Sequence, residues 1–258
     1  MMAVFVIADL HLDTVTYEKS MEVFGNRWQG YIEKIKNNWT RVVEQNDTVI
    51  IPGDISWALT TEDALEDIRW IDALPGRKLI MKGNHDFWWS TVTKMRKFFA
   101  DNGITTIDFL YNNAIELDTF IAAGSRGWFV DKTVQPQKSV NADYSKIVNR
   151  EVIRLKLSLD SAAALQKICA EERGFIPPVS VFLHFPPVWL DFVCRPLVDT
   201  LHAYGNPDCY FGHIHGVYNA PRQTVFEDIR MHLISSDAMD FTLYRLPSVE
   251  MRNQEAGL

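Results

Sequence analysis

The sequence lacks an excess of basic residues. Lys and Arg number 26 against 33 Asp and Glu, which gives a formal net charge of -7. Proteins that bind nucleic acid mainly through the phosphate backbone present a basic face. The composition therefore argues against a nucleic-acid partner or a DNA substrate. It does not exclude a phosphorylated small molecule, because bound metal ions can supply local positive charge.

Cysteines are few, and long apolar runs are missing. The three cysteines, Cys169, Cys194 and Cys209, are widely spaced and form no Cys-x-x-Cys motif. This pattern is typical of reduced, mostly buried thiols, and we expect a cytoplasmic protein. The N-terminal MMAVFVIADLHLD has a short apolar run without a basic leader or a cleavage pattern, so it does not predict a signal peptide. No run is long enough to span a bilayer, and we expect no membrane insertion.

Repeats, low-complexity stretches and linkers are missing as well. Of the 258 residues 47% are hydrophobic, which is enough for one large domain with a substantial core and excludes wholesale disorder. We therefore predict a single domain over residues 1–258. Residues 131–145 are polar and lack periodicity, and we interpret them as a long loop that can act as a lid.

Four segments are expected to be helices. Residues 28–43 place apolar side chains at alternating steps of four and three, which makes one apolar stripe. A second helix begins in TTED and stops at Pro75-Gly76, and a third is capped by Ser90 and stops at Gly103. The fourth covers residues 146–172. The expected buried faces are Trp28, Ile32, Ile35, Trp39 and Val42 in the first helix and Val152, Leu155 and Leu159 in the fourth.

Five short apolar segments, each predicted to be a strand, end in polar residues of one narrow set. In folds that combine sheets and helices, sites gather where the carboxyl ends of strands emit loops. Side chains far apart in the sequence are therefore expected to converge. They are Asp9 and His11 in DLH, Asp54 in PGD, Asn84 and His85 in GNHD, His184 in HFPP, and His213 and His215 in GHIH.

Apart from His85, this set has the composition of a two-metal site. Two carboxylates, one amide oxygen and four imidazoles are too many ligands for one tetrahedral zinc ion. They suit two divalent ions, each four- to six-coordinate with water completing the shell. One carboxylate must bridge the ions, about 3.5–4 Å apart, and such a pair activates a water and polarises a phosphoryl oxygen. The neutral Asn adds no charge, so the site stays cationic toward a phosphate.

The motifs, in this order and each after an apolar segment, resemble those of the calcineurin-like metallophosphoesterase superfamily. The resemblance covers most of the chain, from Asp9 to His215. The resemblance implies an α/β (α+β) fold in which two sheets form an αββα sandwich with the metals at one edge. It also implies two divalent transition-metal ions, of which Mn, Fe and Zn are the candidates. By position it assigns Asp9, His11, Asp54 and His215 to the first ion and Asp54, Asn84, His184 and His213 to the second, with Asp54 bridging.

The same resemblance implies a role for His85, and the sequence departs from the family pattern at one position near it. In the family, the His after the ligand Asn contacts the phosphate and is often proposed as the acid for the leaving group. Many members read Gly-Asp-x-x-Asp, and the second Asp orients this His. Here the segment is GDISW, so Trp57 stands at that place. Asp86 and Asp63 are the candidates to replace the missing carboxylate.

Each motif also has a structural interpretation. Asp and Asn are common in turns after strands, and a lone His184 is more often a packed core residue. The joint occurrence of all seven ligand positions favours a metal site. Trp57, Trp88 and Trp89 are more often core aromatics than substrate contacts. His202 and His232 match no motif, and we expect them on a helix surface and in a strand.

Arg126 in GSRGW is a further candidate for the substrate site. Its guanidinium can bind a phosphate through two parallel hydrogen bonds. The alternative is an ion pair with a neighbouring carboxylate, and the sequence leaves both open.

We therefore predict a dinuclear metal-dependent phosphohydrolase. It would cleave a phosphomonoester or phosphodiester of a small molecule, with a metal-bridging hydroxide as the nucleophile. Within the same superfamily, the alternatives are a UDP-diacylglucosamine pyrophosphatase-like enzyme, suggested by DLHL, and a nucleic-acid-directed member. The first is disfavoured because no basic amphipathic helix is evident for reaching a lipid. A non-catalytic scaffold with this fold would have lost a ligand, and none is missing. The oligomeric state stays open.

Overall fold

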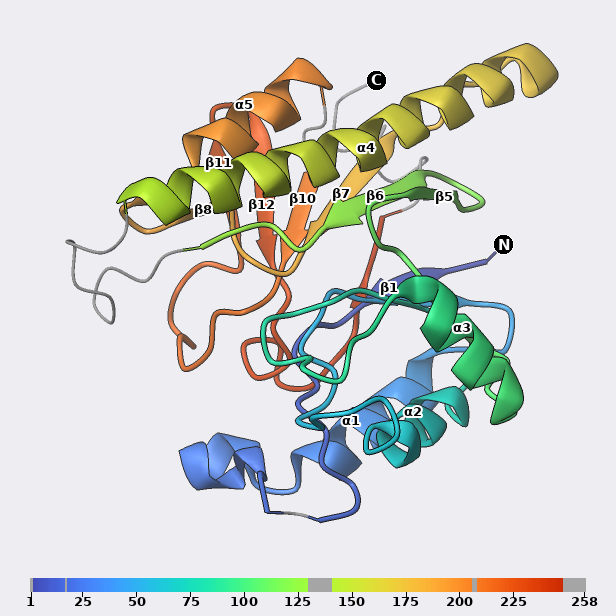
Figure 1. Ribbon diagram of the computed structural model, residues 1–258, viewed down its shortest axis with the longest axis vertical. Helices are drawn as coiled ribbons and strands as arrows, with labels where there is room; N and C mark the ends of the chain where they lie inside the picture. Colours follow the sequence, from blue (N-terminus) through green and yellow to red (C-terminus); the bar gives the residue numbers. More distant parts are fainter. Residues whose placement is uncertain (1, 17, 130–140, 206–207, 248–258) are drawn as a thin grey trace. The chain divides into compact units, whose positions relative to one another are not determined.

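The computed structural model describes residues 2–16, 18–129, 141–205 and 208–247. The fold is mixed α/β with two main sheets flanked by helices, as the resemblance implied (Figure 1). The chain forms two compact units, and each is assembled from separate stretches of sequence. The first unit contains residues 1–109, 212–220 and 234–258, and the second contains residues 110–211 and 221–233. The prediction of a single domain stays a prediction.

A five-stranded sheet forms the centre of the first unit. Its order is β13-β1-β2-β3-β4, with β1 to β4 parallel and β13 antiparallel to β1. The strands are β1 (Val4–Val6), β2 (Thr48–Ile51), β3 (Arg77–Ile80), β4 (Ile107–Phe109) and β13 (Tyr244–Arg245). The parallel strands share one carboxyl edge, so the loops after β1, β2 and β3 begin at the same side of the sheet. These loops carry three of the predicted motifs.

Helices connect the parallel strands of this sheet, as parallel pairs require. They are α1 (Tyr31–Val42), α2 (Leu65–Asp72) and α3 (Val92–Asp101), and two short 3-10 turns, η1 (Met21–Phe24) and η2 (Asn26–Trp28), precede α1. Ile35 and Trp39 are fully buried on α1, as the apolar stripe predicted. Val42 is 39% exposed, so its predicted burial is wrong. The helix ends there, and the extended Val43 is buried instead.

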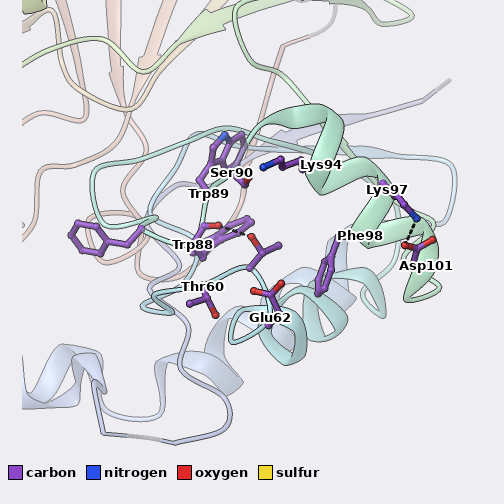
Figure 2. Close-up of a pocket in the computed structure, with 11 residues that line it drawn as sticks. Thr60, Glu62, Trp88, Trp89, Ser90, Lys94, Lys97, Phe98 and Asp101 are labelled. Atoms are coloured by element: carbon purple, nitrogen blue, oxygen red, sulfur yellow. Dashed lines mark hydrogen bonds and ion pairs between the residues drawn. The ribbon is translucent and has the colours of Figure 1, made fainter.

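The predicted cap of α3 is wrong by one residue. Thr91, not Ser90, has extended backbone, and its hydroxyl accepts a hydrogen bond from the Lys94 amide. A hollow of about 580 Å³ lies beside α3 and is lined by Thr60, Trp88, Trp89, Lys94 and Phe98, among others (Figure 2). None of the predicted ligands lines it. Trp88 and Trp89 are both buried, which agrees with a core role.

The second unit contains a six-stranded sheet in the order β11-β12-β10-β7-β6-β5. The inner four strands are parallel, and β11 and β5 at the edges are antiparallel to their neighbours. The strands are β5 (Ala114–Glu116), β6 (Ile121–Ser125), β7 (Val179–Leu183), β10 (Asp208–Phe211), β11 (Gln223–Phe226) and β12 (Ile229–Leu233). A two-stranded ribbon of β8 (Val188–Trp189) and β9 (Phe192–Val193) lies between β7 and α5 in the chain.

Two helices pack in this second unit, α4 (Asn141–Arg173) and α5 (Arg195–Ala203) (Figure 1). Leu155 and Leu159 are buried on α4 as predicted, whereas Val152 is only half-buried. The predicted loop over 131–145 is wrong from Asn141 onward, because α4 begins there. Residues 131–140 of that loop lie outside the described part of the chain. Among the described helices, none is both long and apolar enough to cross a membrane.

Candidate metal centre

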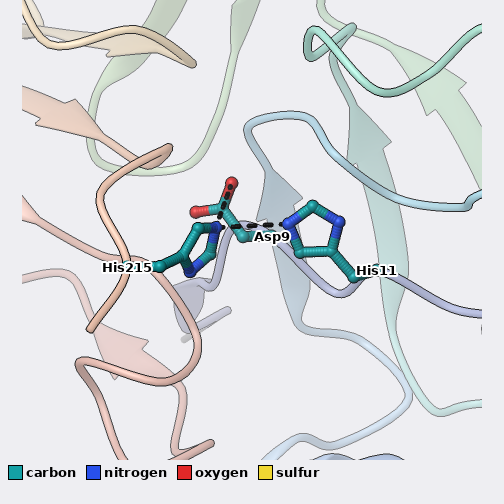
Figure 3. Close-up of side chains that lie close together, drawn as sticks. All are labelled: Asp9, His11 and His215. Atoms are coloured by element: carbon teal, nitrogen blue, oxygen red, sulfur yellow. Dashed lines mark hydrogen bonds and ion pairs between the residues drawn. The ribbon is translucent and has the colours of Figure 1, made fainter. Parts of the chain in front are cut away.

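The loop after β1 and the segment after β10 bring three predicted ligands of the first ion together. Asp9, His11 and His215 each present one ligand atom within 4.8 Å of the others (Figure 3). The two imidazole Nε2 atoms of His11 and His215 are 3.2 Å apart, and His215 Nε2 lies 3.9 Å from Asp9 Oδ1. Asp9 and His11 are buried. Two imidazole nitrogens and a buried carboxylate converging on one point form a donor set that suits a divalent transition metal.

Asp54 lies beside both predicted groups of ligands in this unit. Its Oδ2 is 3.7 Å from His11 Nε2. Asp54 and His213 also present ligand atoms within 4.8 Å of one another. The other carboxylate oxygen, Oδ1, accepts a hydrogen bond from the His85 amide at 2.8 Å. This position fits a bridging carboxylate, and Asn84, next to His85, follows β3 at the same edge of the sheet.

His184 and Arg126 belong to the second unit. His184 is fully buried directly after β7, and its amide donates to the Arg126 carbonyl at 3.1 Å. The Arg126 guanidinium lies 3.8 Å from the buried carboxylate of Glu151, and Arg154 pairs with the same carboxylate. The ion-pair interpretation of Arg126 therefore has structural support. Its contact with a phosphate stays a prediction.

The ligand loops hold a strained backbone. Asp9, His11, Asp54 and His213 have φ values of 62°, 46°, 51° and 70°, in the left-handed region that non-glycine residues rarely adopt. Such strain persists only where surrounding contacts fix it, and it is frequent at functional sites. Here the contacts include the His213 amide, which donates to Asp9 Oδ2 at 2.9 Å. Sequence reasoning had no signal for these conformations.

Two glycines leave room for the central carboxylates. A Cβ atom on Gly83 would lie 2.0 Å from Asp54 Oδ1, and one on Gly212 would lie 2.5 Å from Asp9 Oδ2. Any larger residue would displace a carboxylate oxygen. The presence of glycine at the first position of GNHD and of GHIH is therefore explained by lack of space for a side chain, and not by turn propensity alone.

The electrostatics of the centre favour a bound cation. Burial, with a smaller contribution from the charge of Asp54, raises the pKa of Asp9 to about 7 against the opposing effect of His215. Burial likewise raises the pKa of Asp54. A metal ion between these carboxylates would hold them ionised and offset the cost of burying their charge.

Asp237 is a site residue that sequence reasoning missed. Its buried carboxylate lies 2.8 Å from His215 Nδ1. Burial alone would lower the pKa of His215, but the hydrogen bond to Asp237 and the charge of Asp9 raise it to about 9. A signal was available in the sequence, because SSDAMD follows an apolar strand in the same way as the recognised motifs do.

Trp57 packs between two imidazoles of the centre. Its ring centroid is 4.5 Å from that of His85 and 4.9 Å from that of His11, and it is nearly parallel to the His11 ring. The departure from the family pattern therefore places an indole against His85. Trp57 therefore lines the site beside His11 and His85.

Neither candidate carboxylate pairs with the His85 ring. Asp86 is fully buried and directed elsewhere. It accepts hydrogen bonds at 2.7–3.0 Å from the backbone amides of Asp54, Ile55 and Gly83 and from the Trp88 indole. Asp86 thus joins the loops after β2 and β3. Asp63 is exposed, and no carboxylate in the described part of the chain accepts a hydrogen bond from the His85 ring.

The two histidines without a motif lie where they were expected. His202 is exposed on α5, 3.4 Å from Glu227, and His232 lies in β12 stacked on Tyr210 with centroids 4.4 Å apart. The three cysteines are buried and free, as predicted.

Comparisons with known proteins agree with this centre. The family model described as calcineurin-like phosphoesterase matches residues 2–217, a range that includes every predicted ligand. Gene 66 protein of Mycobacterium phage L5 is 33% identical over 81 residues, which cover 31% of this chain and 37% of the phage protein. The chain thus matches little more than a third of that relative.

Two solved structures are similar to nearly the whole length of this chain. The protein TT1561 of Thermus thermophilus has a TM-score of 0.54 and 8% identity, with 95% of this chain and 98% of that chain covered. The phosphopantetheinyl hydrolase PptH of Mycobacterium tuberculosis has a TM-score of 0.47 and 13% identity, with 96% and 97% covered. At 8% identity, the likeness to TT1561 concerns the fold alone.

Proposed function

Because this chain belongs to the calcineurin-like phosphoesterase family and is a metal-dependent phosphoesterase, we propose that it hydrolyses a phosphorylated small molecule with two divalent metal ions. The observation that carries the proposal is the place of Asp54. Its Oδ2 lies 3.7 Å from His11 Nε2 of the first ligand group. Asp54 and His213 of the second group present ligand atoms within 4.8 Å of one another. A carboxylate between two imidazole groups is what a dinuclear centre requires.

Asp54 would serve both ions, and the other ligands would divide between them. The chain's donors for the first ion are Asp9, His11, Asp54 and His215, and for the second Asp54, Asn84, His184 and His213. Mixed oxygen and imidazole donors suit Mn, Fe or Zn better than Ca or Mg. When bound, the ions would supply a water of lowered pKa as the nucleophile and positive charge for the phosphoryl oxygens of a monoester or diester.

The remaining residues act on the substrate and on the ligands. His85 stands next to Asn84 and beside Asp54, so its imidazole can donate a hydrogen bond to a phosphoryl oxygen. Trp57 keeps that imidazole in place by packing and restricts water on one side. Arg126 is a candidate for a further phosphate contact, for which its guanidinium would have to leave Glu151.

The family match runs through both compact units, which supports treating them as one domain. The free, buried cysteines agree with a reducing compartment, and we propose a cytoplasmic location.

Hydrolysis of a chromogenic aryl phosphodiester and of its monoester tests the proposal. Protein stripped with a chelator should be inactive and should regain activity with Mn²⁺, Fe²⁺ or Zn²⁺. Asp54→Asn should stay inactive under the same loading, which excludes a contaminating phosphatase. Absence of turnover on either ester in protein that carries two metal equivalents would identify a non-catalytic scaffold instead.

A further inference from the structure

We propose that Asp237 is a positioning residue that orients His215 toward the first metal ion. The inference rests on the proposed function only in that it requires an ion to bind Asp9, His11 and His215. No family motif used above includes Asp237, which follows β12 near the end of the described chain.

The hydrogen bond to Asp237 selects the form of His215 that a metal needs. Asp237 Oδ1 lies 2.8 Å from His215 Nδ1. An ionised carboxylate can only accept, so Nδ1 must carry the hydrogen and the lone pair of a neutral ring must be on Nε2. Nε2 is the atom that lies 3.2 Å from His11 Nε2 and 3.9 Å from Asp9 Oδ1. The ring is therefore turned correctly for the metal, and its neutral form has the lone pair on the nitrogen that faces the other ligands.

Two contacts besides the one with His215 hold Asp237 in place. It is fully buried, and its second oxygen accepts a hydrogen bond from the Gly216 amide at 2.9 Å. Arg27 Nε donates to its backbone carbonyl at 2.6 Å, and the Arg27 guanidinium lies over the Tyr218 ring at 4.4 Å from the centroid. The Asp237 carboxylate thus forms hydrogen bonds with both the ring of His215 and the backbone amide of Gly216.

A purely structural role for Asp237 makes a different prediction. A carboxylate that only fixes the loop at Gly216 would affect unfolding but not the affinity for one particular ion. A carboxylate that orients a metal-binding histidine affects that affinity, typically by 10–100-fold. Only the affinity of the ion at His215 should change, because Asp237 contacts none of the second ion's predicted ligands that lie in this unit.

The test is titration of chelator-stripped protein with Mn²⁺, followed by calorimetry or by the electron paramagnetic resonance signal of free Mn²⁺. Asp237→Ala should weaken one of two binding steps by roughly 10–100-fold and leave the other unchanged. Asp237→Asn, which fills the same space and can still accept through its amide oxygen, should weaken the same step less. Asp240→Asn is the matched control, because Asp240 also pairs with Arg27, at 3.5 Å, but its side chain is 68% exposed. It should titrate like the wild type.

Wild-type affinity for both steps in Asp237→Ala and Asp237→Asn would overturn the inference. If neither variant folds, nitrogen-15 NMR of zinc-loaded wild-type protein decides the question. It should show a proton on His215 Nδ1 and the metal on Nε2, and metal on Nδ1 would overturn the inference. A wild type that binds two ions and responds to Asp237→Ala, yet hydrolyses no phosphoester, would refute the proposed function alone. A wild type that binds no ion would refute both.

Discussion

The indole ring of Trp57 packs against the imidazole of His85 with ring centroids 4.5 Å apart, where many members of the family carry an orienting Asp. In the described part of the chain, no carboxylate accepts a hydrogen bond from the His85 ring. Packing fixes a ring in space, but it does not stabilise an imidazolium as a carboxylate does. His85 is therefore better placed to bind a phosphoryl oxygen than to deliver a proton to the leaving group.

Replacing His85 with Ala should impair hydrolysis of alkyl and aryl esters alike. Acid catalysis matters most for a poor leaving group such as an alkoxide and least for a nitrophenolate, whereas a phosphate contact serves both. The measurement is kcat/KM of wild type and His85→Ala on a matched pair of such esters. Asp63→Asn is the control and should change neither value. A loss of roughly 10²–10⁴-fold on the alkyl ester with a far smaller loss on the nitrophenyl ester would show that His85 is the acid after all.

Asp54→Asn should be among the most damaging single changes. Asp54 is predicted to bind both ions, so removing its charge should weaken the binding of both. Asp9→Asn should weaken the binding of the first ion more than that of the second. Elemental analysis should give close to two metal equivalents for the wild type, after titration if necessary. Asp54→Asn should retain fewer equivalents than Asp9→Asn. Intact metal binding in Asp54→Asn beside its loss in Asp9→Asn would refute the bridging role, and wild-type saturation at one equivalent would refute two ions.

Metal affinity should rise with pH. An imidazole binds a metal only when it is neutral, and four of the seven predicted ligands are His. Without metal the pKa of His215 is about 9, raised by Asp237 and Asp9 against the effect of burial, so below that pH a proton must leave as the first ion binds. The affinity of the first ion should therefore fall from pH 9 downward, and that of both ions steeply below about 6. Metal content after dialysis at pH 5, 7 and 9 measures this, and a flat profile would contradict imidazole ligation.

The positions of the site residues could be predicted from the sequence because each follows an apolar strand, and parallel strands share an edge. Asp9, Asp54 and Asn84 lie in loops after β1, β2 and β3 for that reason. The pairing of His215 with Asp237 could not be predicted, because they lie 22 positions apart in the chain with two strands, β11 and β12, between them. Periodicity also failed at the end of α1, where Val42 is exposed and the extended Val43 after it is buried instead.

Lys78 should make stability depend on pH. Its side chain is buried, and burial lowers the pKa of its amine to about 8, against a smaller opposite effect of Asp72. The unfolded chain therefore binds more protons than the folded one between about pH 8 and 10.5, so the free energy of unfolding rises with pH in that range.

Urea unfolding of wild type and Lys78→Met at pH 8 and pH 10.5, both in excess chelator, isolates the contribution of this amine. Other titrating groups are common to the two proteins and cancel in the difference. The free energy of unfolding of the wild type should rise relative to that of Lys78→Met as the pH rises. Parallel stabilities of the two proteins across this range would show that the Lys78 amine is not desolvated in the folded state.

Gly83→Ala and Gly212→Ala should abolish or strongly weaken metal binding, because the new methyl groups would lie 2.0 Å from Asp54 Oδ1 and 2.5 Å from Asp9 Oδ2. Both contacts are far below van der Waals distance, and the backbone amide of Asp54, 2.3 Å from the Gly83 methyl, cannot rotate away. Gly103→Ala is the control: its methyl would meet nothing within 4 Å, and its φ of +75° costs about 1–2 kcal/mol of stability without touching a ligand. Mn²⁺ titration and thermal unfolding in chelator should separate the three variants. Wild-type metal affinity in Gly83→Ala would mean that Asp54 can move without loss, which is incompatible with a fixed carboxylate shared by two ions.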